Sequence, residues 1–205
     1  MFARASDLAG DAAVVAGDDA ELSSRVVTVI RLNHVVELIL FRLVGELDAR
    51  GIAKRRGEGS TAKLLQHAGM APAVAHRYVR VGTALDDIAS VAAYAVDGSL
   101  SGEHVDAIVK GLKHIERRIP ELPEADRTDC VRGLLTEALG TSPAAVSVRA
   151  RHMALVLSPP DKEIPDAENH ELNDFTLGIG DDGRSRGTLD LDNLLGEKLD
   201  RKSVV

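Results

Sequence analysis

Apolar residues recur every three to four positions through most of residues 19–157, the spacing of helices that bury one face. The longest such run begins at a capping residue, Asp19 or Ser23, and should end at Gly51. About 30 residues at 1.5 Å each give a helix of roughly 45 Å, long for a globular protein. Its segment 35–41 is apolar on most sides, so we expect other helices or a second subunit to cover it.

Shorter helices follow, each marked by a cap or a proline. Ser60 or Thr61 begins a helix that runs to His67, and Pro72 stands in the first turn of the next, residues 73–85. The segment KRRGEGS before Ser60 is typical of a basic, glycine-rich linker. Further helices are predicted from Asp86 or Asp87 to Val96, from Ser101 to Ile115, over residues 124–139, and from Pro143 onward after the cap Ser142.

The helical spacing ends in an acidic, proline-containing linker, residues 158–171. Beyond it apolar and polar residues alternate around an Asp-Asp-Gly turn, which predicts a β-hairpin; the apolar members are Leu172, Phe175, Leu177 and Ile179. A short amphipathic segment follows, and the chain then stops at RKSVV in a way that looks truncated. Residues 172–205 are therefore expected to form a hairpin and a short helix.

The expected fold is mainly α. A multi-helix bundle over residues 19–157 contains one long N-terminal helix and a helix-turn-helix-like pair, with a small C-terminal β-hairpin added. Residues 1–18, rich in Ala, Gly and Asp, form a flexible lead-in. Aromatic residues make up only 2% of the chain, so its core is built from Ala, Val, Leu and Ile, and single-stranded nucleic acid has few stacking surfaces here.

Charge is unevenly distributed along the chain. The net charge is −7, which argues against attraction of the whole protein to phosphate or to anionic lipid. Between Arg50 and Arg80, however, seven Lys or Arg residues stand against Glu58 alone, a local charge of +6. A basic surface inside an acidic protein is therefore predicted.

The compartment expected from the sequence is the cytoplasm. The most apolar run, residues 35–47, contains Glu37, Arg42 and Glu46 and is shorter than the roughly 18 uncharged residues of a membrane helix. The acidic N-terminus has no secretory signal, and the single Cys130 forms no internal disulfide. We expect no contact with a membrane.

The basic surface surrounds the helix pair at residues 61–85. Its candidate DNA-binding residues are Lys54, Arg55, Arg56, Lys63, His76, Arg77 and Arg80. The first positions of the second helix, residues 73–76, are poor in groups that read base edges, so contact with the phosphates of double-stranded DNA is better supported than sequence reading. The alternative is an ordinary bundle corner with a solvated basic face.

The order of motifs resembles the 13E12-repeat family of actinobacteria, domain of unknown function 222. The matching residues are Ser60, Thr61, Leu64, Leu65, Pro72, Ala75, Val79, Arg80, Leu85, Gly98, Leu100, Ser101, His104, Val105 and Ile108. The closing stretch LGIGDDGRSRGTLDLDNLLGEKL is similar to the hairpin of that family. The resemblance, over roughly residues 20–200, implies a non-catalytic helical domain that usually precedes an HNH endonuclease domain in repeated or mobile elements; that nuclease part is missing here.

No catalytic, metal or cofactor site is predicted for this chain. The segment 168–174 gathers Glu, Asn, His and Asp but lacks the second histidine of an HNH centre, and Cys130 lacks the cysteine pairs of a zinc site. His104 is expected to cap or pack its helix, and Asn33 and His34 to form interhelical hydrogen bonds.

Two other functions stay open at this stage. The over-apolar long helix also fits a protein–protein interaction or dimerisation module without DNA binding, with a possible homodimer through that helix. A degenerate fragment without function is the third possibility.

Overall fold

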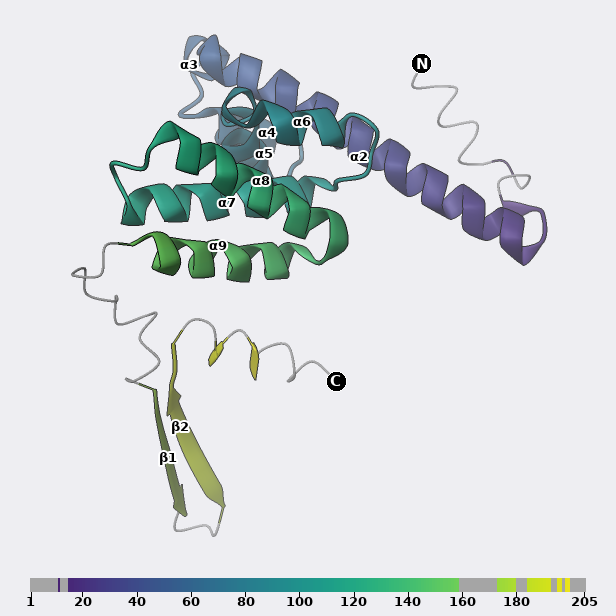
Figure 1. Cartoon of the computed structure of the whole chain (residues 1–205). Helices are drawn as coiled ribbons and strands as arrows, with labels where there is room; N and C mark the ends of the chain where they lie inside the picture. The colour runs from purple at the N-terminus through teal and green to yellow at the C-terminus, as the bar shows by residue number, and fades with distance from the viewer. Residues whose placement is uncertain are drawn as a thin grey trace.

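The structure, a computed structural model, describes residues 11, 15–158, 173–179, 184–192, 195–196 and 198–199. Within them the chain is mainly helical with a small β-hairpin, as expected (Figure 1). The elements are α2 (Asp19–Ala49), α3 (Ile52–Arg55), α4 (Thr61–His67), α5 (Pro72–Gly82), the 3₁₀ turn η2 (Asp86–Ile88), α6 (Ala89–Ala95), α7 (Gly102–Arg118), α8 (Glu124–Gly140), α9 (Pro143–Leu157), β1 (Asp174–Ile179) and β2 (Ser185–Asp190).

Most helix starts follow the predicted caps. The backbone N–H groups of Lys63, His104 and Ala145 donate to the hydroxyls of Ser60, Ser101 and Ser142, so these three serines begin α4, α7 and α9. The cap of α2 is Asp18, which accepts from the Glu21 N–H at 2.8 Å, rather than Asp19 or Ser23. The long helix ends where predicted, because Gly51 takes the left-handed conformation with φ of 62°.

The expected linker after α2 is wrong in its first part. Residues 52–55 form α3, whose Ala53 is buried in the bundle, so burial of a small side chain favours one more helical turn before Gly57 ends it. The second helix of the pair is also shorter than predicted, ending at Gly82 rather than Leu85. Tight turns after Gly82 lead into η2 and α6, which replace the single helix expected at 86–96.

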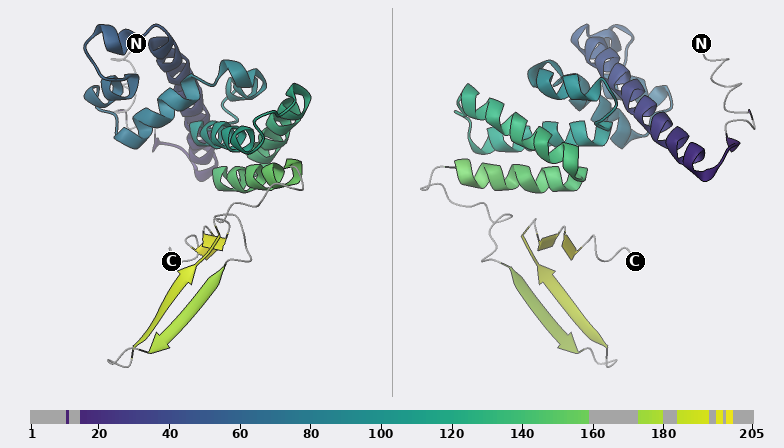
Figure 2. Two further views of the ribbon diagram at one scale, coloured as in Figure 1. Left: turned by 90° about the vertical axis from the view of Figure 1, so that its left-hand side faces the viewer. Right: turned by 45° about the vertical axis from the view of Figure 1, so that its right-hand side comes forward.

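The helices pack around α7. This helix carries the largest set of buried residues of any described helix and contacts α5, α8 and α9 (Figure 2). A Cβ atom on Gly111 would lie 2.7 Å from the Ala150 Cβ, so α7 and α9 approach more closely there than larger side chains permit. The other helices cover only the second half of α2, and its first half extends beyond the bundle (Figure 1).

The long helix crosses α5 at a contact between two glycines. A Cβ atom on Gly45 would lie 2.4 Å from the Gly82 carbonyl oxygen, and one on Gly82 would lie 2.5 Å from the Phe41 carbonyl oxygen. Beside this crossing the rings of Phe41 and Tyr78 pack with their centroids 4.5 Å apart. Val44 and Val81 are fully buried on either side, so this crossing joins α2 to the core.

The β-hairpin is confirmed at the predicted place. Its strands pair antiparallel, with Asp174 opposite Asp190 and Ile179 opposite Ser185. At its base, Asn173 donates to Asp192 at 2.7 Å, and Asp192 in turn accepts from the Leu195 N–H at 2.9 Å. The predicted linker after Ser158, the Asp-Asp-Gly turn and most of the predicted lead-in lie outside the described residues. Among the described helices, none is both long and apolar enough to cross a bilayer.

The glycine crossing yields a stability prediction. Gly45→Ala places a methyl group against the Gly82 carbonyl, so α2 and α5 must separate, and we expect the free energy of unfolding to fall by about 1–3 kcal/mol. Gly140→Ala is the control, because a Cβ atom there meets nothing within 4 Å. Urea denaturation of the three proteins measures the difference, and a Gly45→Ala variant as stable as Gly140→Ala would contradict the crossing.

Candidate functional site

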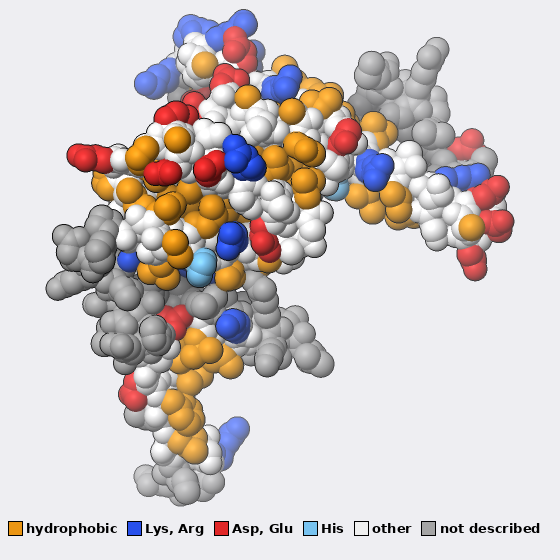
Figure 3. Space-filling model, viewed as in Figure 1, with side chains coloured by type: hydrophobic (Ala, Val, Ile, Leu, Met, Phe, Trp, Pro, Cys, Tyr) orange, Lys and Arg blue, Asp and Glu red, His pale blue; other side chains and the backbone are white. Residues whose placement is uncertain are grey.

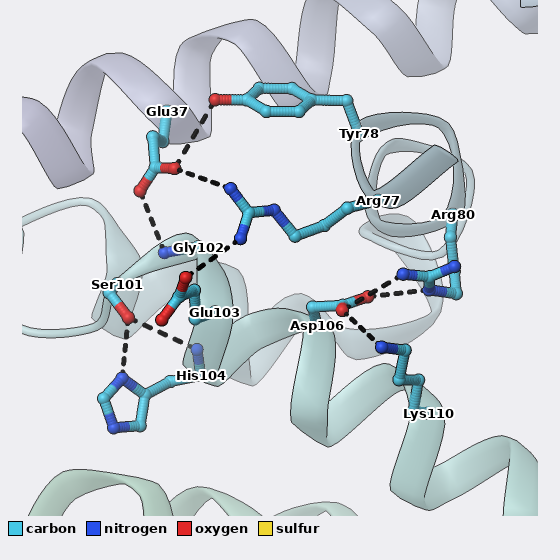
Figure 4. Close-up of polar contacts among 10 residues, drawn as sticks. All are labelled: Glu37, Arg77, Tyr78, Arg80, Ser101, Gly102, Glu103, His104, Asp106 and Lys110. Atoms are coloured by element: carbon cyan, nitrogen blue, oxygen red, sulfur yellow. Dashed lines mark hydrogen bonds and ion pairs between the residues drawn. The ribbon is translucent and has the colours of Figure 1, made fainter. Parts of the chain in front are cut away.

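A polar cluster joins α2, α5 and the start of α7 (Figure 4). The Glu37 carboxylate accepts from the Tyr78 hydroxyl at 3.4 Å and from the backbone N–H of Gly102 at 3.1 Å. It also lies 3.7 Å from the Arg77 guanidinium. A carboxylate at the first N–H of α7 satisfies a free donor and complements the helix dipole, so Glu37 caps α7 from another helix.

The two arginines of α5 face carboxylates. Arg77 donates to Glu103 at 3.2 Å, and its side chain is only 20% exposed. Arg80 donates through two nitrogens to Asp106, at 2.7 and 3.1 Å, and Asp106 also pairs with Lys110 at 3.0 Å (Figure 4). Asp106 itself is 6% exposed. Both guanidinium groups therefore have carboxylate partners within the chain, and the side chains of Arg77 and Arg80 are themselves only 20% and 28% exposed, unlike those of open phosphate-binding groups.

Tyr78 lies at the edge of this cluster. Burial raises the pKa of its hydroxyl, and the neighbouring Glu37 carboxylate raises that pKa further. The hydroxyl therefore stays protonated and donates to Glu37. The guanidinium of Arg77 lies 5.9 Å from the centre of the same ring, which adds a cation–π contact.

The remaining predicted cations gather at the end of the bundle formed by α3 and α4, which are in contact. Lys54, Arg55, Arg56 and Lys63 are all exposed, and within the described part of the chain none is ion-paired with a carboxylate. Arg55 donates to the Arg50 carbonyl, which closes the end of α2. Figure 3 shows Lys and Arg side chains, with some acidic ones among them, at the end where α3 lies. We call Lys54, Arg55, Arg56 and Lys63 the basic end.

The helix pair α4–α5 is packed into the bundle. Ala75 is fully buried and Val74 partly buried, since α5 lies against both α4 and α2. Of the predicted cationic or titratable residues on α5, only His76 is exposed. The start of α5 therefore presents few side chains that could enter a DNA groove. This agrees with the sequence of residues 73–76, which contains few groups that hydrogen-bond to base edges.

The histidines predicted to be structural have structural partners. His104 bonds through Nδ1 to the Ser101 hydroxyl at 2.7 Å and through Nε2 to the Thr141 carbonyl at 2.9 Å. His34 bonds through Nδ1 to the Gly98 carbonyl at 2.8 Å, so it holds the turn before α7 against α2. Asn33 is exposed, which contradicts the interhelical hydrogen bond expected for it within this chain.

The chemistry available at other candidate positions is limited. Cys130 is buried, and burial raises the pKa of its thiol, so the reactive thiolate is disfavoured. Among the described residues, no group of three or more His, Cys, Asp or Glu side chains stands close enough together to hold a metal ion. The acidic segment around His170 lies outside the described residues apart from its last two positions, 173 and 174.

The sequence left open whether other helices or a second subunit cover the apolar segment 35–41, and in the structure a row of apolar side chains on α2 is exposed. Val29, Leu32, Val36, Ile39 and Leu43 are each 52–60% exposed on α2, and their spacing of three and four residues places them along one face. We call these five residues the outer stripe. The buried residues of α2, Leu38, Phe41 and Val44, lie on its other side. The spacing itself could have revealed two apolar faces on one helix, but not which of them the bundle covers.

Comparison with known proteins gives one match. A family model described as "Domain of unknown function (DUF222)" matches residues 19–203. Neither a curated protein nor a solved structure matches the chain.

The Arg80–Asp106 pair yields a test of the polar cluster. Asp106→Asn removes the carboxylate that pairs with Arg80, and Arg80→Gln leaves the buried Asp106 carboxylate with Lys110 as its remaining cation. We expect each change to lower the free energy of unfolding by about 1–3 kcal/mol. The double variant should lose clearly less than the sum of the two, because one interaction is removed only once.

The exposed pair Arg132–Asp129, 2.8 Å apart, is the control for this cycle. Both of its side chains are mostly exposed, so its coupling energy should be about 0.5 kcal/mol or less. Equal coupling energies in the two cycles would show that Arg80 is not held by Asp106 in solution.

Proposed function

The chain belongs to the DUF222 family, and we propose that it is the non-catalytic, DNA-associated helical part of an HNH-endonuclease-type protein. The resemblance to the 13E12-repeat family supports this assignment. It also implies that the protein comes from a repeated or mobile element. The nuclease chemistry belongs to a different domain in this proposal. The helical part supplies a surface that holds DNA.

The observation that carries DNA contact is the basic end. Four exposed cations from α3, its C-terminal cap and α4 lie at one end of a protein whose net charge is −7. A local cationic surface on an acidic protein directs a polyanion to that surface alone. Lys and Arg side chains without base-reading neighbours suit the phosphate backbone, so the contact is independent of sequence.

The proposed DNA-contacting set is smaller than the set predicted from the sequence. Arg77 and Arg80 are left out of the DNA-contacting set because Glu37, Glu103 and Asp106 already neutralise them. His76 is exposed on α5 but belongs to a helix whose arginines are paired. Four residues rather than seven therefore form the proposed surface.

A second candidate function is a helical protein–protein interaction module. The outer stripe and the projecting first half of α2 favour it, because monomeric proteins seldom leave a long helix with this much apolar surface uncovered. The two functions use opposite features of the molecule, the basic end and the apolar helix, and so can be tested apart.

Fluorescence anisotropy with a duplex, from 50 to 300 mM salt, tests the proposed DNA contact. We expect the duplex to bind. The logarithm of its association constant should fall linearly with the logarithm of salt concentration, with a slope of about −3.6 for four neutralised phosphates. Changing all four residues of the basic end to Gln should abolish binding at 50 mM salt.

A second four-residue variant controls for net charge. Lys113, Arg117, Arg132 and Arg149 are exposed elsewhere on the bundle, and changing them to Gln removes the same charge. This variant should keep most of the affinity. Loss of binding in both variants, or absence of binding by the unchanged chain at 50 mM salt, would contradict DNA contact at the basic end. The basic end would then be an ordinary solvated corner of the bundle.

Hydrogen exchange tests the interaction module. Residues 19–33 are exposed throughout, so without a partner their amides should exchange far faster than those of residues 35–48. If a second copy covers α2, the amides of both halves should be similarly protected from exchange, and the protection of residues 19–33 should weaken on dilution. Fast exchange of residues 19–33 at every protein concentration would argue against self-association through this helix.

A further inference from the structure

The outer stripe has an internal symmetry about Val36. Val29 and Leu43 lie seven residues before and after Val36, and Leu32 and Ile39 lie four before and three after. A helix reversed about Val36 therefore presents nearly the same stripe. Two copies related by a two-fold axis through Val36 can place Leu32 beside Ile39 and Val29 beside Leu43.

Charged pairs at the two ends of the stripe share this symmetry. At the start, Glu21 and Arg25 form an i,i+4 ion pair, and at the end Glu46 and Arg50 form another. All four side chains are about half exposed or more. Reversal about Val36 brings Arg25 opposite Glu46 of a second copy, and Glu21 opposite Arg50.

The opposite orientation is electrostatically unfavourable. Two parallel helices in register would place each charged residue against its own copy, Arg25 against Arg25 and Glu46 against Glu46. Like charges facing each other cost energy, whereas the antiparallel arrangement pairs each acid with a base. The charge order along α2 therefore selects antiparallel pairing.

The bundle leaves the outer stripe accessible. The buried face of α2, with Phe41, Val44 and Gly45, lies on the side away from the outer stripe, so each bundle would stand outside the pair of helices. Figure 1 shows that the first half of α2 projects clear of the bundle, free to lie along the second half of another α2.

We propose that this chain forms an antiparallel homodimer through the outer stripe of α2, with Val36 on the two-fold axis and Arg25 paired with Glu46 of the second copy. The proposal rests on the second candidate function, the interaction module, and is independent of DNA contact. It gives the projecting half of α2 a partner, namely the second half of the same helix in another copy.

Sedimentation or light scattering of the full chain is the first test. The chain should be a dimer, and Leu32→Glu with Ile39→Glu should make it a monomer with unchanged helical circular dichroism, because both side chains are exposed in the single chain. Val96→Glu with Val156→Glu is the matched control, since it changes two equally exposed apolar residues elsewhere and should leave the dimer intact.

Charge reversal tests the pairing and does not depend on the apolar variants folding. Arg25→Glu or Glu46→Arg alone should weaken the dimer about tenfold, because two symmetric contacts become repulsive. The double variant should regain the original dimer affinity. It does not restore the ion pairs within each helix, to Glu21 and Arg50, so recovery reports the contact between copies.

Disulfide cross-linking tests the orientation, in a chain whose own cysteine is changed by Cys130→Ala. Val36→Cys should cross-link with itself, and Val29→Cys should cross-link with Leu43→Cys but not with itself, because the antiparallel copies hold residue 29 roughly 21 Å from its counterpart. Self-linking of Val29→Cys would establish parallel pairing and overturn the proposal.

Two further results would also overturn it. One is a monomer at every concentration tested; the other is a dimer that the stripe variants leave unchanged, which would use a different surface. Neither result bears on DNA contact, which the basic-end variants test separately.

Discussion

The close approach of α2 and α5 at Gly45 and Gly82 decides which face of the long helix the bundle covers. Two backbones meet there without intervening side chains, so the large neighbours Phe41 and Val44 reach fully into the core. A helix that buries this face must turn the opposite face outward. The exposure of the outer stripe is therefore a consequence of the glycine contact, and not a separate feature of α2.

Electrostatics follows from the same packing. Once α5 lies on α2 and beside α7, Arg77 and Arg80 come within reach of Glu37, Glu103 and Asp106 (Figure 4). These carboxylates are remote along the chain, so a count of charge over residues 50–80 includes arginines whose charge is already compensated. What stays uncompensated among the predicted residues is the basic end on α3 and α4. A run of positive charge in a sequence therefore forms a basic surface only where no carboxylate from another part of the chain pairs with it in space.

The two proposed surfaces fit together in one assembly. An antiparallel pair of α2 helices would place the two basic ends at opposite ends of the pair. Residue 50 of each copy lies 14 residues, or about 21 Å, from the symmetry axis, so the two basic ends are roughly 42 Å apart along the pair. Two cationic ends on one acidic dimer could each hold phosphates independently. Each surface would still function without the other, because they share no residue.

The sequence by itself determined the local structure. The serine caps, Pro72, Pro143 and Gly51 act within one turn of chain, so the starts of α4, α7 and α9, the end of α2, and the β-hairpin followed from it, as did the family. Only the tertiary structure decided the rest. α3 depended on the burial of Ala53, the end of α5 on its crossing with α2, and the roles of Arg77 and Arg80 on carboxylates from other helices. Caps and turns depend on neighbours a few residues away, whereas ion pairs and exposed faces depend on which helices meet.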